Sequence, residues 1–270
     1  MRAMQLVSGS KFKRAQSRLV HSRQTLEFLD GLLQRILATT PDLTHPLAAR
    51  HDTAPGALII VTSDAGLAGS YNTNLIQLAE AELRRDAARQ THVSFIGKRG
   101  YRYFTKRGWQ ARDAYLDLAG RPDLAKIDAI SKTFLDRFLA GEIGSVRLLY
   151  AKFVSPAISR PTMKQWLPIE LSRQQKAKKG YVAYPVDYIF EPSPERVFEE
   201  LLPRWTMATF RLVLLEAFTS EHGARMIAMK NATDNAEELL KSLTMQRNKI
   251  RQASITKEIS EIVGTAEALK

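Results

Sequence analysis

One short segment of the chain has the composition of a phosphate-binding loop. SDAGLAGSYN (63–72) is rich in glycine and small polar residues, and it follows the apolar run ALIIVT (57–62). A glycine-bearing turn between a strand and a helix can present backbone N–H groups to a phosphate. The segment lacks GxGxxG spacing, and no Gly-Lys-Ser/Thr follows it. Two interpretations stay open here: a tight turn capped by Asp64 or Asn72, or a site for a phosphate-bearing ligand.

The other side chains that could act in catalysis are scattered. The histidines show no metal-ligand spacing, no HExxH-type arrangement is present, and the serines form no GxSxG turn. The chain has no cysteine, which excludes disulfides, zinc–thiolate sites and cysteine nucleophiles. We therefore expect no catalytic residue, no cofactor and no metal, and a chain that is not an enzyme by itself. The histidines are His21, His45, His51, His92 and His222.

The chain is strongly basic, with a net charge of +12, which indicates an acidic partner. Nucleic acid, a membrane surface and an acidic protein are the candidates. The basic residues are dispersed apart from RQQKAKK (173–179), which we expect to be a loop, and this dispersal disfavours nucleic acid. The sequence contains no apolar run of membrane-spanning length, and its first residues do not form a secretory signal.

Residues 1–40 are predicted to form one helix of a coiled coil. Apolar residues recur at alternating spacings of three and four, which is the pattern of a heptad seam, and Ser22 is its only polar member. The helix should end before Pro41, because the residue before a proline avoids helical geometry. The seam consists of Phe12, Ala15, Leu19, Ser22, Leu26, Leu29, Leu33 and Ile36.

Residues 57–192 change to the pattern of an α/β domain. Short apolar runs alternate with amphipathic segments, which predicts a parallel or mixed sheet with helices on its faces. The predicted strands are 57–62, 92–97, 109–115, 145–155, 166–171 and 187–191. The predicted helices are 73–90, 101–107 and 122–141.

Residues 193–270 are predicted to form one long helix. Ser193 is suited to cap it and Pro194 to occupy its first position, whereas Pro203 is expected to kink or interrupt it. From about Trp205 onward, roughly 60 residues of good helix formers would make a rod ~90 Å long.

Two apolar stripes run along the surface of this helix, and each needs a partner to cover it. An antiparallel coiled coil with residues 1–40 would give both terminal helices a partner, with Met226 and Met229 as core residues, while the final turns would reach past that helix to another protein. The predicted fold is therefore α/β: an antiparallel coiled coil of the N- and C-terminal helices with an inserted Rossmann-like α/β domain. The stripes are Met226, Met229, Thr233, Ala236, Leu240 and Leu243, then Ile255, Ile259, Ile262, Ala266 and Leu269.

The C-terminal sequence resembles the gamma subunit of F-type ATP synthase. RMIAMKNATDNAEELL (225–240) and RNKIRQASITKEISEIV (247–263) are similar to the family's C-terminal helix, and AMQLVSGSKFKRAQ (3–16) to its N-terminal helix. VTSDAGLAGSYNTNL (61–75) is similar to its first strand and turn, and DYIFEPSP (187–194) to the passage before its last helix. The resemblance covers essentially the whole chain.

This resemblance implies a non-catalytic rotor in the central stalk. The two terminal helices would form a shaft inside a hexamer of alternating alpha and beta subunits, and the α/β domain would sit, with an epsilon-type subunit, on the membrane ring of c subunits. Ion flow through the ring would turn the shaft and drive ATP synthesis or hydrolysis at the beta subunits. The protein would be peripheral on the cytoplasmic face of a bacterial inner membrane, with no nucleic-acid partner.

The resemblance also implies which residues contact partners. Positions matching the family's beta-subunit contacts are Met4, Arg251, Gln252, Thr256 and Glu258. Lys241 and Arg247 are added on charge alone. Positions matching the ring contacts are Tyr188, Phe190 and Glu191. Two alternatives remain from the residues themselves: an α/β enzyme that binds a phosphate-bearing ligand through 63–72, and a basic coiled-coil nucleic-acid binder.

Overall fold

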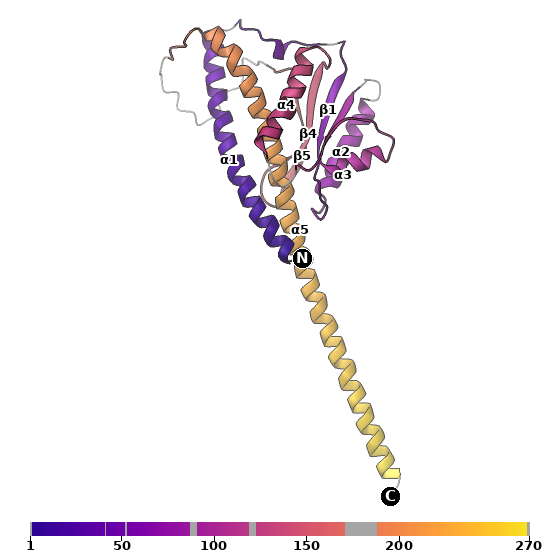
Figure 1. Cartoon of the computed structure of the whole chain (residues 1–270). Helices are drawn as coiled ribbons and strands as arrows, with labels where there is room; N and C mark the ends of the chain where they lie inside the picture. Colours follow the sequence, from indigo (N-terminus) through magenta and orange to yellow (C-terminus); the bar gives the residue numbers. More distant parts are fainter. Residues whose placement is uncertain are drawn as a thin grey trace.

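Two long helices and a five-stranded sheet dominate the structure (Figure 1). The sheet lies beside the first half of the C-terminal helix, and the second half of this helix extends alone beyond the rest of the chain. The computed structural model describes residues 2–40, 42–51, 53–86, 91–118, 123–170 and 188–268.

The two terminal helices run antiparallel, as the sequence predicts. Helix α1 spans Arg2–Thr39 and helix α5 spans Pro194–Ala268, and the N-terminus of α1 lies beside the middle of α5 (Figure 1). The predicted cap is confirmed, because the Arg196 N–H donates to the Ser193 hydroxyl at 3.3 Å. Helix α1 also ends before Pro41, as expected.

The predicted heptad seam of α1 is buried against α5 and the sheet. Leu19 and Ile36 are almost fully buried, and Ser22 is half-buried. On α5, Met229 is 5% exposed, and the Met226 sulfur lies beside Gly9. The interpretation of these methionines as coiled-coil core residues is therefore confirmed. The buried apolar members of the seam are Phe12, Ala15, Leu19, Leu26, Leu33 and Ile36.

The sheet is mostly parallel, with strand order β3-β2-β1-β4-β5. Strand β1 pairs parallel with β2 and β4, β2 pairs parallel with β3, and β5 runs antiparallel to β4. The strands are β1 (Gly56–Val61), β2 (His92–Ile96), β3 (Ala111–Tyr115), β4 (Ser145–Phe153) and β5 (Ser159–Leu167).

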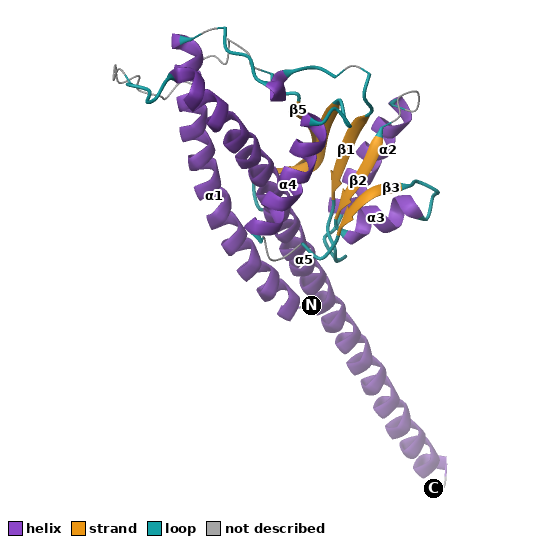
Figure 2. Ribbon diagram, turned by 45° about the horizontal axis from the view of Figure 1, so that its top comes forward, coloured by secondary structure: helices purple, strands orange, loops and turns teal. Residues whose placement is uncertain are grey.

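Helices cover both faces of the sheet (Figure 2). Because side chains alternate along a strand, Leu58 and Ile60 of β1 pack with α2 and α3, whereas Ile59 and Val61 pack with α4 and α5. The second face also joins α1 to the core, so the coiled coil and the sheet share one apolar cluster. The short helix η1 (Pro46–Ala48) precedes the first strand, and the helices between the strands are α2 (Tyr71–Arg85), α3 (Lys98–Thr105) and α4 (Leu124–Leu139).

Three sequence-based expectations about secondary structure are wrong. The strand predicted at 166–171 begins much earlier, at Ser159, and ends at Leu167, where Pro168 removes a backbone donor. Residues 188–191, predicted as part of a strand, form no regular structure. The interruption of the helix expected as one outcome at Pro203 does not occur: α5 continues through this residue, because the adjacent Leu202 is fully buried and packing outweighs the lost hydrogen bond. The basic run at 173–179 lies outside the described residues.

Candidate functional site

The loop after β1 is held by helix α3 and not by a ligand. The first three N–H groups of α3 donate to this loop: Lys98 to the Asp64 carboxylate (3.0 Å), Arg99 to the Ser63 carbonyl (3.0 Å) and Gly100 to the Thr62 hydroxyl (2.9 Å). Asp64 therefore caps α3 and not α2, which corrects the expectation from sequence. The positive end of α3 is already satisfied by the protein.

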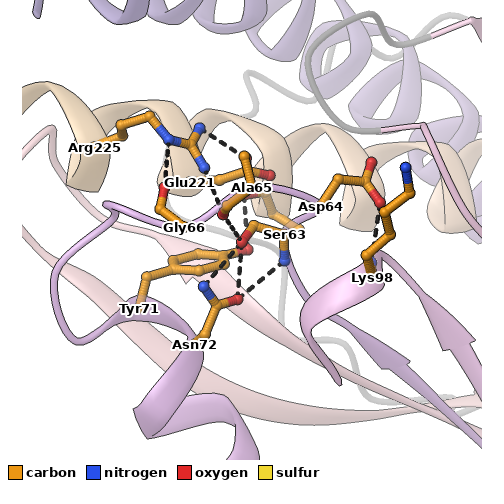
Figure 3. Close-up of polar contacts among 10 residues, drawn as sticks. Ser63, Asp64, Ala65, Gly66, Tyr71, Asn72, Lys98, Glu221 and Arg225 are labelled. Carbon is orange, nitrogen blue, oxygen red and sulfur yellow. Dashed lines mark hydrogen bonds and ion pairs between the residues drawn. The ribbon is translucent and has the colours of Figure 1, made fainter. Parts of the chain in front are cut away.

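Asn72 also has a different role from the expected cap. Its side chain turns back to Ser63, accepting from the Ser63 N–H at 3.1 Å and donating to the Ser63 hydroxyl at 2.8 Å (Figure 3). The N-cap of α2 is Ser70, which makes no side-chain cap hydrogen bond. The segment 63–72 is thus a closed turn fixed by its own side chains.

Helix α5 occupies the place where open α/β sheets bind nucleotides. The strand order reverses between β1 and β4, and ligands of such folds bind outside the carboxyl ends of the strands at that point. Here Ser220 of α5 donates to the Ala151 carbonyl of β4 at 3.0 Å, and the backbone of Gly223 packs closely on the loop after β4. A Cβ at Gly223 would stand 2.8 Å from the Pro156 carbonyl oxygen. The crevice is filled by protein, so the structure does not support the phosphate-ligand interpretation.

Arg225 joins α5 to the loop after β1. Its guanidinium donates to the Gly66 carbonyl at 3.1 Å and to the Ala65 carbonyl at 3.0 Å, and it pairs with Glu221 at 2.8 Å (Figure 3). Tyr71 at the start of α2 adds a hydrogen bond to the Ala217 carbonyl at 3.1 Å. We call the loop 62–69 together with residues 217–225 of α5 the joint.

The joint buries two adjacent titratable side chains. Glu221 and His222 are each 2% exposed, and Glu221 Oε2 and His222 Nδ1 have no hydrogen-bond partner among the residues that the structure describes. Burial raises the pKa of Glu221 to about 7, although Arg225 opposes this shift. Burial lowers the pKa of His222 to about 4, and the cations of Arg225 and Lys11 act in the same direction.

A second polar cluster lies nearer the start of α5, between α1, α5 and the sheet. Glu216 is 5% exposed and pairs with Arg23 of α1 at 2.6 Å. Burial, and then Glu216, raises the pKa of Tyr150 well above its usual value, and burial lowers the pKa of Lys164. This cluster connects both helices of the coiled coil to β4 and β5.

All the residues predicted to contact beta subunits, except Met4, lie on a largely exposed stretch of helix α5. From Asp234 to Ala268, which we call the rod, α5 makes almost no contact with the rest of the described chain. Its apolar side chains are open to solvent; Leu240 is 66% exposed and Ile262 68%. The predicted residues in the rod, all exposed, are Lys241, Arg247, Arg251, Gln252, Thr256 and Glu258.

Met4 does not lie level with these residues. Gly9 lies beside Met226, so in the antiparallel pair Met4 stands opposite about residue 231. Arg251 is then roughly 30 Å further along, at 1.5 Å per residue. Met4 is half-exposed at the end of α1, where the rod begins. The residues predicted to contact beta subunits are therefore distributed along the axis of α5 and do not lie at one position on it.

The residues predicted to contact the ring lie at the opposite end of the molecule. Tyr188 is 43% exposed, stacks on Phe190 with a centroid separation of 6.3 Å, and lies under the Arg35 guanidinium at 4.3 Å. Phe190 also packs on the main core, and Glu191 is exposed. These three residues form one surface immediately before α5.

The sequence reasoning missed Glu221 and Arg225 of the joint. Glu221 and Arg225 stand four apart in EHGAR (221–225), inside a largely apolar part of the helix. Opposite charges at this spacing indicate an ion pair on one face of the helix, so the sequence alone could have identified the pair. Their partners could not be read, because Gly66 is 159 positions away from Arg225. Within the described ranges, no group of histidines and carboxylates could hold a metal, and no helix is long and apolar enough to cross a membrane.

Fold and site together define a structural subunit: a long shaft fixed to an α/β sheet whose ligand crevice is filled by the shaft itself. A family model described as "ATP synthase" matches residues 1–269. The chain is 40% identical to the ATP synthase gamma chain of Symbiobacterium thermophilum, with all of this chain and 92% of that chain covered. It is 37% identical to the gamma chain of Moorella thermoacetica, with 100% and 93% covered.

Solved structures agree on the fold. The central stalk and c-ring structure of the Tetrahymena thermophila mitochondrial ATP synthase contains a chain with a TM-score of 0.62 at 19% identity, covering 86% of this chain and 98% of that one. A chain of the Euglena gracilis enzyme gives 0.57 at 17% identity, covering 97% and 95%. The chain belongs to the gamma-chain family of F-type ATP synthases. Members are rotor subunits of the central stalk, and the catalytic sites lie in the beta subunits, so this chain is non-catalytic.

Proposed function

We propose that the rod turns inside a hexamer of alternating alpha and beta subunits and forces the beta subunits through their nucleotide states. The observation that carries this proposal is the length of helix from 234 to 268, whose apolar side chains are left uncovered by the rest of the described chain. An asymmetric shaft can favour a different conformation in each of several equivalent neighbours, which couples rotation to binding.

Charge supports acidic loops of beta subunits as the contacts of the rod. Every charged residue between 241 and 257 is basic, and all of them are exposed. Complementary charge of this kind favours association and sets orientation. Lys241, Arg247 and Arg251 are the proposed cationic contacts, with Gln252, Thr256 and Glu258 as neighbouring polar ones, and Met4 touches a partner where the rod begins.

The opposite end is the proposed contact with the membrane ring. Tyr188, Phe190 and Glu191 form a small aromatic and acidic surface there, suited to the polar loops of c subunits. An epsilon-type subunit would sit beside the sheet. In this arrangement the protein is peripheral to a bacterial inner membrane, on its cytoplasmic face, and nucleic acid is not a partner.

Two experiments test the proposal. Tagged chain should copurify with alpha and beta subunits under gentle conditions, and recovery of the chain alone would contradict it. In the assembled enzyme, Arg251→Glu with Gln252→Leu should lower coupled ATP synthesis severalfold more than it lowers assembly. Arg204→Glu, a charge reversal on the exposed face of α5 outside the rod, is the matched control and should change neither. Equal losses of synthesis and assembly would mean that Arg251 and Gln252 are only structural.

A further inference from the structure

We propose that residues 206–225 of α5 form a rotational lock, in which polar attachments to several elements prevent the shaft from turning about its own axis relative to the sheet. This inference rests on the proposed function, because a rotor must pass torque from its sheet to its rod. The apolar seam alone is poorly suited to that task. Burial of apolar surface is non-directional, whereas hydrogen bonds weaken steeply as their geometry is distorted.

The polar attachments come from different elements. Trp166 of β5 donates to the Thr206 carbonyl at 3.0 Å. Arg211 makes a forked contact with Asp128 of α4, with its closest pair at 2.6 Å. Forked guanidinium–carboxylate pairs fix orientation as well as distance.

Further attachments follow along the helix towards the rod. Glu216 pairs with Arg23 of α1, and Ser220 donates to a carbonyl of β4. Tyr71 of α2 and the Arg225 guanidinium complete the set at the joint. The last attachment therefore stands only a few turns before the rod begins.

These attachments surround much of the helix. At 3.6 residues per turn, Arg225 lies about 100° and Arg211 about 140° around the axis from Thr206, while Glu216 lies about 80° on the other side. A turn of α5 in either direction would therefore stretch contacts on both sides. Gly223 adds a steric element, because its bare backbone lies against the Pro156 carbonyl and any shift of register would bring a side chain there.

The test compares two attachment points on the same rotor. The chain has no cysteine, so a bead can be tethered through Lys106→Cys beside the sheet or through Arg204→Cys on α5 itself, with the rod held in an alpha–beta hexamer. Both positions are free for this purpose, because Lys106 is exposed and Arg204 has 74% of its side chain exposed. In the unmodified chain without ATP, the angular variance of the sheet-tethered bead should exceed that of the α5-tethered bead only by the variance of the lock itself.

The lock is then weakened by two charge-neutral pairs of substitutions, Asp128→Asn with Arg211→Gln and Glu221→Gln with Arg225→Gln, which leave no buried charge unpaired. If the attachments act independently, removing a third of them raises the variance of the lock about 1.5-fold. The excess variance of the sheet-tethered bead over the α5-tethered bead should rise by this factor, and the variance of the α5-tethered bead should not change.

Equal variance of the two beads in the weakened rotor would overturn the inference. If the combined variant fails to assemble, Asp128→Asn with Arg211→Gln alone serves, because both side chains are about a third exposed and tolerate substitution. That variant must still show excess variance only at the sheet-tethered bead. Rotation of the unmodified rotor on adding ATP reports the proposed function separately, so failure of one is distinguishable from failure of the other.

Discussion

Glu221 and His222 are adjacent and buried, and their pKa values are shifted in opposite senses, so replacing either one should change how stability depends on pH. The pKa of Glu221 rises from 4.5 to about 7 in the folded chain, and that of His222 falls from 6.5 to about 4. The groups facing them are Arg225 on the same helix, Asp64 in the loop after β1 and Lys11 on α1.

The two residues act with opposite signs. Glu221 binds its proton more tightly when folded, so its contribution to stability is complete below pH 4.5 and is lost as the pH rises to about 7. His222 binds its proton less tightly when folded, so its contribution is complete above pH 6.5 and is lost as the pH falls towards 4. Linkage gives about 2 kcal/mol for each between pH 5 and 7, and the two changes nearly cancel.

Substitution should remove this compensation. In Glu221→Gln only the contribution of His222 to the pH dependence remains. The free energy of unfolding should therefore rise by about 2 kcal/mol from pH 5 to 7 relative to the unmodified chain. In His222→Gln it should fall by about 2 kcal/mol over the same interval. Gln24→Ala, on the exposed face of α1, removes no titratable group and is the control, which should leave the pH dependence unchanged.

Urea denaturation, monitored by tryptophan fluorescence, measures the free energy of unfolding directly. Trp166 is 3% exposed and packs on Phe210 of α5, the helix that carries the joint, so its emission reports unfolding of this region. Unfolding free energies are compared at pH 5, 6 and 7 as differences from the unmodified chain, so that titration elsewhere cancels. If the unfolding free energies of both variants follow that of the unmodified chain within about 0.5 kcal/mol at every pH, the pKa values of the two side chains are not shifted in opposite directions. The description of the joint would then be wrong.

Three other single substitutions and one deletion test separate parts of the structure. Gly223→Ala should destabilise the chain by about 1–3 kcal/mol despite the better helix propensity of alanine, because its Cβ meets a carbonyl. Gly264→Ala, where a Cβ meets nothing, should instead raise helicity measured by circular dichroism; a lower helicity would contradict a free helical rod. Arg23→Ala should lower the free energy of unfolding in urea by about 2 kcal/mol, because it leaves buried Glu216 without its ion-pair partner. Adding Glu216→Gln to this variant should recover part of the lost stability. Deleting 246–270 should change the free energy of unfolding by less than about 0.5 kcal/mol, and a larger loss would mean that the rod packs on the body.

Local patterns in the sequence predicted most elements of the fold. The three-and-four spacing from Phe12 to Ile36 identified the coiled-coil seam, and Ser193 followed by Pro194 identified the start of the long helix. Each of these signals lies within a few residues and reflects one physical cause, either burial of a helix face or satisfaction of a helix end. The parallel sheet followed from alternation of apolar runs with amphipathic segments.

The polar contacts that fix the shaft to the sheet could not be predicted in the same way. Arg225 and Gly66 are 159 positions apart, and Arg23 and Glu216 are 193 apart. Nothing in either local sequence indicates its partner, because such pairings follow only from the three-dimensional packing. Asp64 shows the same limit: its position suggested a cap for the next helix in the chain, yet the parallel strand order places α3 nearer to it. The partner contacts of the rod remain predictions from family resemblance and charge.

Direct observation of rotation tests the central claim most sharply. A bead tethered to Lys106→Cys, with the rod inserted in an immobilised alpha–beta hexamer, should turn in one direction when ATP is added and should pause once for each beta subunit. Hydrolysis of ATP at a normal rate with a bead that does not turn would contradict the claim that this chain is the moving shaft.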